Sequence, residues 1–504
     1  PRSLASLLRL LSLGLSTHPL LRVLAVVFSS HLFVFYFLPL VLLLYYAAPP
    51  RCRHLLLSVL SYLFYGWANP LFVVLMAFST TVDYVCGRVI SANLNAGATP
   101  QGRRAKTALI VSIVTNLSLL GFFKYFNFGV DSFNALATSL GAPAWQWDTF
   151  FRITLPLGIS FYTFQSMSYT IDVYRGHATA IRNPVDFACY VSMFPQLVAG
   201  PIIRFHEVAR QLESRTHTLE KIARGTALFC LGLAKKVLLA NSCGLLADVV
   251  FEASFRSCLD AWIGLLAYSF QIYFDFSGYS DMAIGLGLML GFTFPKNFDS
   301  PYRSASITEF WRRWHLSLSH WLRDYLYLPL GGNRKGPSRT YVNLAMVMLL
   351  GGLWHGAAWT FVAWGSLHAG ALIVERALGK QSLYHRFPRP LRVAITFIIV
   401  AIGWVFFRSD SISQAASFLA SLVGFAPPDT AAAAASTLLS GMTHQPWLLG
   451  WLAIAAVVTW AAPQSWDWTR RITAPRAAML IGLLGISLLL LATQSFNPFI
   501  YFIF

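Results

Sequence analysis

The residue of this sequence with the clearest chemical potential is His355, an imidazole inside a long apolar stretch. The run from Tyr341 to Val374 contains no Asp, Glu, Lys or Arg, and glycines lie on both sides of the histidine. Ionisable groups in such segments are rare and usually face the protein interior or an aqueous path. A base of near-neutral pKa there could remove a proton from an attacking hydroxyl. The alternative is a histidine that only hydrogen-bonds a neighbouring helix, which is the favoured interpretation for His368.

A second imidazole, His315, lies in the polar segment at residues 306–325. Ser306 and Glu309 have capping-box spacing, so a helix is predicted to begin there. Aromatic and aliphatic residues recur around His315 at helical spacing, while arginines on the other face can reach water or phosphate. This pattern indicates an amphipathic helix at the membrane surface or just below it. The second imidazole could hydrogen-bond a developing oxyanion, or it could be a merely interfacial residue.

A third polar cluster runs from Tyr268 to Asp281. Asp275 and Asp281 lie in an apolar context, so they must be neutral, paired or hydrated. The sequence contains no G-x-S-x-G, no phosphate-binding glycine loop and no H-E-x-x-H motif. Its six cysteines show no C-x-x-C pair, so no metal site is expected. Two histidines without a nucleophile motif are compatible with acyl transfer, but they do not identify it.

The elements that must position these residues are membrane helices. Of 504 residues, 56% are hydrophobic and only 12% are charged, against about one-quarter in a soluble domain. Helix breakers and polar residues within 153–171 and 261–292 predict broken or re-entrant helices. The expected fold class is an all-α polytopic membrane protein. Its spans or deep apolar segments are expected at 31–48, 55–66, 71–85, 107–123, 153–171, 186–200, 226–240, 261–292, 341–376, 393–407, 447–462 and 478–493.

The net charge of +18 does not indicate nucleic-acid binding, because the basic residues lie in connectors between apolar runs. Positive-inside topology instead predicts that two basic regions, Arg204 to Lys236 and Arg303 to Arg339, face the cytosol. Residues 1–26 carry three arginines and no acid, which is compatible with an N-terminal extension, an interfacial helix or a misassigned translation start. Residues 27–504 are expected to form a single membrane domain, with the core motifs in 153–408.

Five motifs, taken together in their order and spacing, closely resemble the membrane-bound O-acyltransferase (MBOAT) family. Within the family they resemble the membrane subunits of bacterial alginate O-acetylation systems. The similarity runs from about Val27 to about Arg408. The motifs are Ile159 to Arg175, Ala199-Gly200-Pro201, Tyr273 to Asp281, Phe310 to His315, and Gly352-Leu353-Trp354-His355-Gly356.

The resemblance implies a helical bundle around a central tunnel, with re-entrant and amphipathic helices. It makes His355 the catalytic base and His315 a second catalytic group that binds or polarises the thioester carbonyl. It also implies acetyl-CoA as donor substrate, no bound cofactor or metal, and an extracytoplasmic exopolysaccharide as acceptor, reached directly or through periplasmic acetylation proteins of a polysaccharide-modification complex. The expected location is the bacterial inner membrane, among membrane lipids. Residues expected to line or orient the substrate path are Asp275, Tyr279, Asp281, Trp311, Arg312 and Trp354.

Three alternatives remain at this stage. The same chemistry could act on peptidoglycan or cellulose, or transfer D-alanine to teichoic acid, because the two-histidine motifs do not separate these acceptors. Buried Asp and His residues could instead relay protons in a secondary transporter. The chain could also be a non-catalytic scaffold of a secreted acetylation complex.

Overall fold

The computed structural model describes residues 28–67, 69–95, 102–147, 152–379, 386–425, 437 and 439–493. Within these ranges the chain is helical and has no β-strand, which confirms the all-α prediction. Residues 1–26, expected as an extension or interfacial helix, lie outside the described part. The chain divides into two compact units: residues 1–198 with 202–215, and residues 199–201 with 216–504.

Five helical segments of the described chain are long and apolar enough to cross a membrane. They overlap five of the predicted spans and confirm a multi-pass membrane protein. Shorter apolar helices, such as Pro446–Ala461, accompany them. The five candidate spans are Pro70–Asn93, Arg103–Ser139, Leu219–Glu252, Arg389–Arg408 and Ala474–Thr493.

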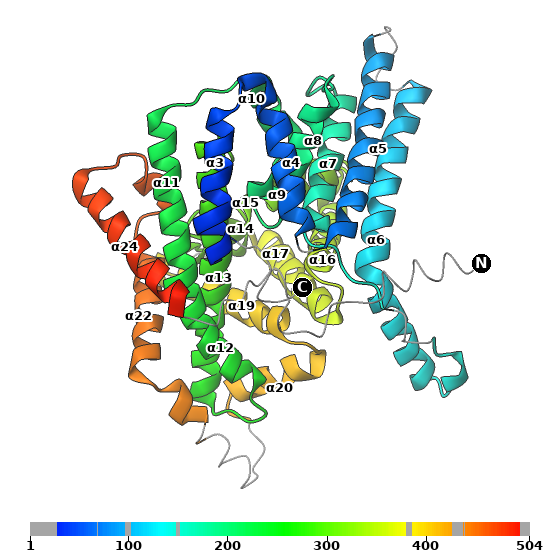
Figure 1. Cartoon of the computed structure of the whole chain (residues 1–504). Helices are drawn as coiled ribbons and strands as arrows, with labels where there is room; N and C mark the ends of the chain where they lie inside the picture. Colours follow the sequence, from blue (N-terminus) through cyan, green and yellow to red (C-terminus); the bar gives the residue numbers. More distant parts are fainter. Residues whose placement is uncertain are drawn as a thin grey trace. The chain divides into compact units, whose positions relative to one another are not determined.

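The first unit contains two long apolar helices that lie side by side, α5 (Pro70–Asn95) and α6 (Arg103–Ser139) (Figure 1). Both pack on α7 (Ile159–Tyr174), which begins six residues later than the predicted segment at 153. Gly158 explains this start, because its φ of 71° is left-handed and Leu197 O leaves no room for a Cβ. Among its described residues this unit also contains the α-helices α3 (Leu38–Ala47), α4 (Arg53–Gly66), α8 (Pro184–Ser192), α9 (Phe194–Leu197) and α10 (Phe205–Glu213).

The second unit is built around α13 (Cys258–Met289), which packs along α11 (Leu219–Ala234) and α12 (Asn241–Glu252). A Cβ on Gly225 would clash with Gly285 O, and a Cβ on Gly285 would clash with Gly225 O. Small residues facing each other let membrane helices approach closely, so the glycines fix α13 against α11. The remaining long helices of this unit are α16 (Gly336–His355), α17 (Trp359–Leu378), α19 (Arg389–Arg408), α20 (Ile412–Leu422), α22 (Pro446–Ala461) and α24 (Ala474–Thr493).

Two sequence expectations about helix continuity, those for 261–292 and 306–325, are wrong. The segment 261–292, expected to be broken, is helical without interruption as far as Met289 in α13, where Lys235 and Lys236 pair with its two aspartates. The apolar run 341–376 is two helices, α16 and α17, that pack on each other after a break at 356–358. The amphipathic helix expected over 306–325 is interrupted after α14 (Ile307–Trp311) and resumes as α15 (Leu316–Leu322). The capping prediction holds, since Ser306 Oγ accepts a hydrogen bond from the Glu309 N–H.

Candidate active site

His315 occupies the break between α14 and α15, as the residue before the first turn of α15. Its φ of 44° is left-handed, and the described chain has one other non-glycine residue with positive φ, Ser300. Such a conformation costs about 1–3 kcal/mol and persists only where surrounding contacts impose it. The imidazole is completely buried, and Phe276 of α13 meets it edge to face with ring centroids 4.6 Å apart. A strained backbone that points an imidazole into the protein marks this residue as a functional candidate.

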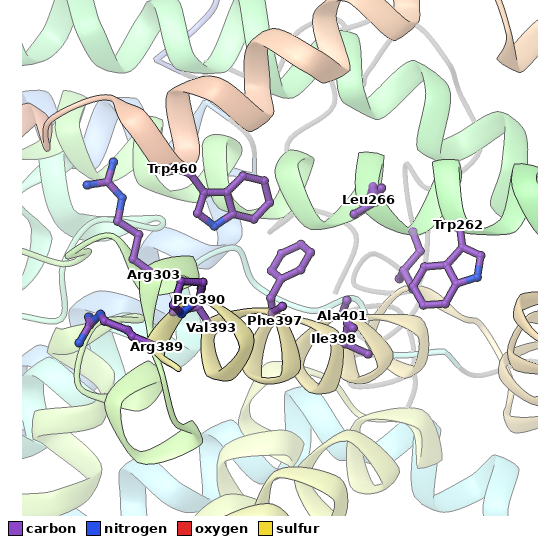
Figure 2. Close-up of a pocket in the computed structure, with 12 residues that line it drawn as sticks. Trp262, Leu266, Arg303, Arg389, Pro390, Val393, Phe397, Ile398, Ala401 and Trp460 are labelled. Atoms are coloured by element: carbon purple, nitrogen blue, oxygen red, sulfur yellow. The ribbon is translucent and has the colours of Figure 1, made fainter. Parts of the chain in front are cut away.

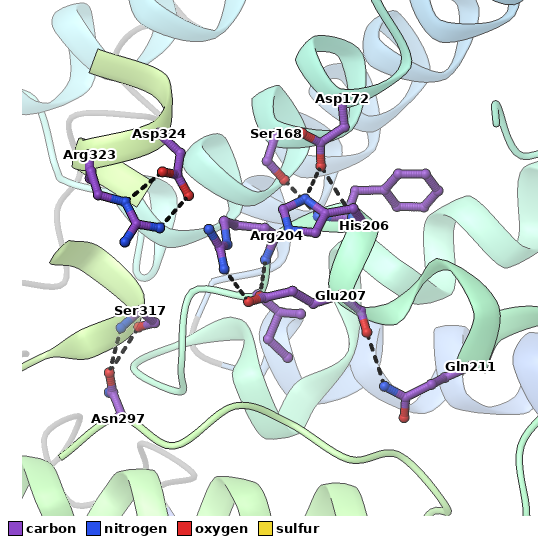
Figure 3. A network of polar contacts seen from close by, with 12 residues as sticks. Ser168, Asp172, Arg204, His206, Glu207, Gln211, Asn297, Ser317, Arg323 and Asp324 are labelled. Carbon is purple, nitrogen blue, oxygen red and sulfur yellow. Dashed lines mark hydrogen bonds and ion pairs between the residues drawn. The ribbon is translucent and has the colours of Figure 1, made fainter. Parts of the chain in front are cut away.

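Asn297 fixes the tautomer of His315 (Figure 3 shows Asn297 with Ser317). Asn297 Oδ1 accepts from the Ser317 backbone N–H at 3.2 Å, and this obligatory donor sets the orientation of the amide. Nδ2 then donates to Ser280 Oγ of α13 at 2.9 Å. His315 Nδ1 lies 3.2 Å from the same Oδ1, so Nδ1 must carry the hydrogen. The neutral ring therefore presents Nε2 as a hydrogen-bond acceptor.

His355 is the last residue of α16 and keeps 7% of its surface exposed. Gly356 follows it because a Cβ there would overlap the ring of Phe361. The rings of His355 and His315 have centroids 6.3 Å apart, so the two histidines converge on one place in the second unit.

Aromatic side chains surround the histidine pair. Trp354 lies 5.0 Å from His355 and 6.1 Å from His315, measured between ring centroids. Trp364 of α17 and Phe407 of α19 each lie 5.3 Å from His355. Helices distant in sequence thus form one apolar wall around two bases, which excludes bulk water and strengthens electrostatic interactions within it.

Several buried ring nitrogens of this wall have no hydrogen-bond partner within the described residues. They are His315 Nε2, Trp311 Nε1, Trp364 Nε1 and both ring nitrogens of His368. His368 is fully buried, with its ring 4.9 Å from Trp364 and 5.2 Å from Trp311. It therefore does not show the helix-to-helix hydrogen bond expected for it. Buried polar groups nearly always have partners, so this cluster is suited to donate hydrogen bonds from the indole N–H groups to a bound molecule or water and to accept them at imidazole nitrogens.

The remaining sequence candidates lie at different distances from this pair. Trp354 is in contact with both histidines, and Trp311 reaches them through Trp364. Tyr279 is buried on α13, and Arg312 is an exposed residue at the end of α14. The structure thus brings one of the six expected path residues, Trp354, next to the two imidazoles, and Trp311 lies one ring further away.

Asp275 and Asp281 are paired with lysines. Lys236 Nζ lies 2.7 Å from Asp275 Oδ1, with both side chains 3% exposed, and Lys235 Nζ lies 2.7 Å from Asp281 Oδ2. Both lysines come from a π-helical turn, η4 (Lys235–Ala240), between α11 and α12. Both lysines are therefore engaged within the protein, and the cytosolic orientation of the region that contains them stays a prediction. They neutralise the carboxylates of α13, because an unpaired buried charge is very costly.

Sequence reasoning missed Asn297, Trp364 and Phe407, and it placed Phe276 and Ser280 in the motif Tyr273 to Asp281 without giving either residue a role of its own. Asn297 follows Pro295 in a connector and carries no motif of its own. The aromatic residues lie in apolar runs where any position could face lipid or protein. In the described residues no three His, Cys, Asp or Glu side chains gather closely enough to hold a metal ion.

Comparison with known proteins places this site in a class. The sequence model of the membrane-bound O-acyltransferase family matches residues 177–409, which include both histidines. The chain belongs to this family and is an O-acyltransferase.

The similarity to individual relatives extends over nearly the whole chain in one case and over less than half of it in another. The probable alginate O-acetylase AlgI of Pseudomonas putida is 45% identical over 497 residues, 95% of this chain and 100% of the relative. The peptidoglycan O-acetyltransferase of Helicobacter pylori is 38% identical over 80% of this chain and 81% of its own. The teichoic acid D-alanyltransferase of Streptococcus thermophilus is 30% identical over 44% of this chain and 57% of its own.

Proposed function

We propose that this protein is an O-acetyltransferase of the bacterial inner membrane that modifies an extracytoplasmic, alginate-like exopolysaccharide. The observation that carries the proposal is the convergence of His315 and His355, 6.3 Å apart, in a chain of this family. The full-length similarity to alginate O-acetylases supports acetyl as the group transferred and alginate as the type of acceptor. Acetyl-CoA is the proposed donor, supplied from the cytosol, and transfer reaches the polysaccharide directly or through periplasmic acetylation proteins.

In the proposed reaction an acceptor hydroxyl oxygen attacks the thioester carbonyl. The new C–O bond forms, the C–S bond breaks, and the hydroxyl proton passes to His355 and then to the departing thiolate. His355 suits the base because it retains some exposure, whereas His315 is fully buried. No net proton is gained or lost, so the base returns to its neutral form after each turnover.

The tautomer of His315 changes the role that the resemblance implied. A neutral ring with hydrogen on Nδ1 cannot donate from Nε2 to a carbonyl oxygen. The proposed role of Nε2 is instead to accept a hydrogen bond, either from the acceptor hydroxyl or from the imidazolium that forms on His355. Such acceptance favours the transition state, in which positive charge develops on the base.

A peptidoglycan acceptor is the second candidate. It is favoured by the relative from Helicobacter pylori, which aligns with four-fifths of this chain. The chemistry at the histidines is the same, so the two acceptors differ in what lies around the site rather than in the mechanism.

The decisive experiment uses the purified full chain in liposomes, with labelled acetyl-CoA and short alginate or peptidoglycan fragments on either side. We expect acetyl transfer that falls about a thousandfold in His355→Ala, within the usual range for loss of a general base. His177→Ala is the matched control, because His177 is an exposed histidine of the first unit. Normal transfer by His355→Ala would remove the base assignment. Solute flux without acetyl-CoA turnover would overturn the enzymatic proposal itself.

A further inference from the structure

An apolar groove on the second unit lies between three helices and has arginines at one end (Figure 2). Its walls come from α13, α19 and α22, and its volume is about 690 Å³. Phe397 and Ala401 of α19 form the floor, with Trp262 of α13 at the far end and Trp460 of α22 beside the arginines. This volume falls in the roughly 300–1,000 Å³ range of small-molecule sites.

The groove faces outward along part of its length. Ile398 is 41% exposed and Trp460 is 39% exposed, although both are apolar. In a membrane protein, apolar exposure of this kind indicates contact with lipid or with another membrane helix. Trp460 also donates from Nε1 to Tyr302 O at 3.2 Å, so its ring is held in place rather than free to fill the groove.

The charges at one end are not balanced. Arg303 donates to the backbone carbonyls of Thr459 and Ala462 and has no carboxylate within ion-pair distance in the described chain. Arg389 lies 3.5 Å from Glu309 but is 60% exposed, and Glu309 also pairs with Arg313 at 2.9 Å. The Glu309 carboxylate therefore pairs with two guanidinium groups, those of Arg389 and Arg313. An excess of positive charge remains at this end of the groove. An anionic group would be attracted there.

The length of the groove distinguishes between a lipid and a protein occupant. From Pro390 to Ala401, α19 rises by about 16 Å at ~1.5 Å per residue. This is about half of the ~30 Å hydrocarbon thickness of a bilayer, so the apolar part matches one leaflet. A partner helix crossing the membrane would continue along the full thickness. At the other end of α19, Arg408 is neutralised by Asp248 at 2.9 Å, so the excess charge is confined to one end.

We propose that this groove binds a phospholipid with an anionic headgroup. The acyl chain lies along the apolar face of α19, and the headgroup phosphate pairs with Arg389 and Arg303. The groove and the wall of the active site share a helix, because α19 also carries Phe407, whose ring lies 5.3 Å from that of His355. A bound lipid therefore supports the outer face of α19, and the inner face of the same helix contacts the proposed catalytic imidazole.

The test is lipid retention by the purified full chain, measured by native mass spectrometry with phosphatidylglycerol and phosphatidylcholine of identical acyl chains. We expect phosphatidylglycerol to be retained about thirtyfold better, in line with ~1 kcal/mol for each of the two basic residues at a charged surface. Arg389→Gln should reduce this preference to about fivefold, whereas Arg470→Gln, an exposed arginine outside the groove, should leave it unchanged. Equal retention of the two lipids by the native chain would overturn the proposal.

A second pair of variants tests the apolar part of the groove. Ala394 is an exposed residue of the lining, so Ala394→Trp fills the groove without disturbing the core. We expect it to reduce retention of both lipids at least about threefold, while Ala453→Trp, at an exposed alanine of α22 outside the lining, leaves retention unchanged. Unchanged retention in Ala394→Trp contradicts the proposal. If Ala394→Trp retains both lipids but loses a membrane protein that co-purifies with the native chain, the proposal is also contradicted. That outcome would identify a helix of a partner protein as the occupant of the groove.

Discussion

The two units of this chain each contain a buried polar cluster, and the two clusters are built in opposite ways. In the first unit Asp83 of α5 accepts hydrogen bonds from Ser112 and Asn116 of α6 and from Ser166 of α7. No buried side-chain nitrogen or oxygen of these four residues lacks a partner. In the second unit the nitrogens of His368 and Nε2 of His315 have none within the described residues.

We infer from this difference that the Asp83 cluster contributes to stability, whereas the histidine cluster contributes to function. A fully satisfied network holds three helices together and leaves nothing for a substrate to bind. The histidine cluster leaves acceptors and donors unused at a cost of about 1–3 kcal/mol for each unsatisfied group. Such a cost is expected where a bound molecule supplies the missing partners. Changes in the two clusters should therefore have separable effects on activity and on unfolding.

The largest effect in this comparison is expected for His315→Ala. We expect the rate constant for acetyl transfer to fall about a hundredfold, because the acceptor at Nε2 is lost. The KM for acetyl-CoA should change by less than about threefold, and the protein should still insert into membranes. His320→Ala, on the same short helix, is the matched control. Wild-type activity in His315→Ala would show that convergence of the two rings has no catalytic meaning.

Asp83→Leu should affect stability instead. Leucine fits an apolar helix but leaves the Asn116 amide and the serine hydroxyls without their acceptor, which should cost about 2 kcal/mol. Unfolding in detergent measures the loss, and Thr81→Leu, at an exposed site on the same helix, provides the baseline. Acetyl transfer per folded molecule should remain within about twofold of the native value. A large catalytic defect in a folded Asp83→Leu protein would contradict the separation of the two clusters.

Asn297→Ala tests the orientation of the second imidazole. We expect about a tenfold lower rate constant, because His315 loses the acceptor that fixes its tautomer. Asn297→Asp should recover most of the activity, since a carboxylate oxygen can accept from the Ser317 N–H and from His315 Nδ1. A purely structural role for Asn297 predicts that the two variants have equal activity when equally folded. Rates measured against pH for both proteins distinguish these outcomes.

The smallest effect is expected for the pair of His206 and Asp172 in the first unit (Figure 3). His206 Nδ1 lies 2.8 Å from Asp172 Oδ2, and this hydrogen bond raises the pKa of His206 above its usual value of 6.5. A raised folded-state pKa stabilises the fold below the unfolded pKa, and the contribution disappears as the pH rises through the folded pKa.

His206→Asn should therefore lower stability more at pH 5.5 than at pH 9. Because the side chain is about one-third exposed, we expect a difference of about 0.5 kcal/mol or less. Thermal unfolding of both proteins across this pH range measures it, and a difference that grows with pH would contradict the assigned sign.

The sequence by itself determined that the chain lies in a lipid bilayer, that its fold is all-α, and which two histidines are the candidate site residues. Apolar runs show membrane helices because only lipid can cover that much apolar surface. An imidazole in an uncharged run is conspicuous for the same reason, and so His355 could be recognised without a structure. The capping box at Ser306 was readable because it depends on residues only three positions apart.

Only the tertiary structure decided how the histidines are placed. Periodicity placed His315 on one face of a continuous helix, whereas a left-handed residue breaks that helix and directs the ring inward. Asn297, which fixes the tautomer, lies 18 positions away and was not detectable by local spacing. Likewise, the carboxylates of α13 are conspicuous in sequence, but their lysine partners are defined by helix packing. Long-range contacts of this kind depend on how apolar helices pack, and many packings are compatible with one apolar pattern.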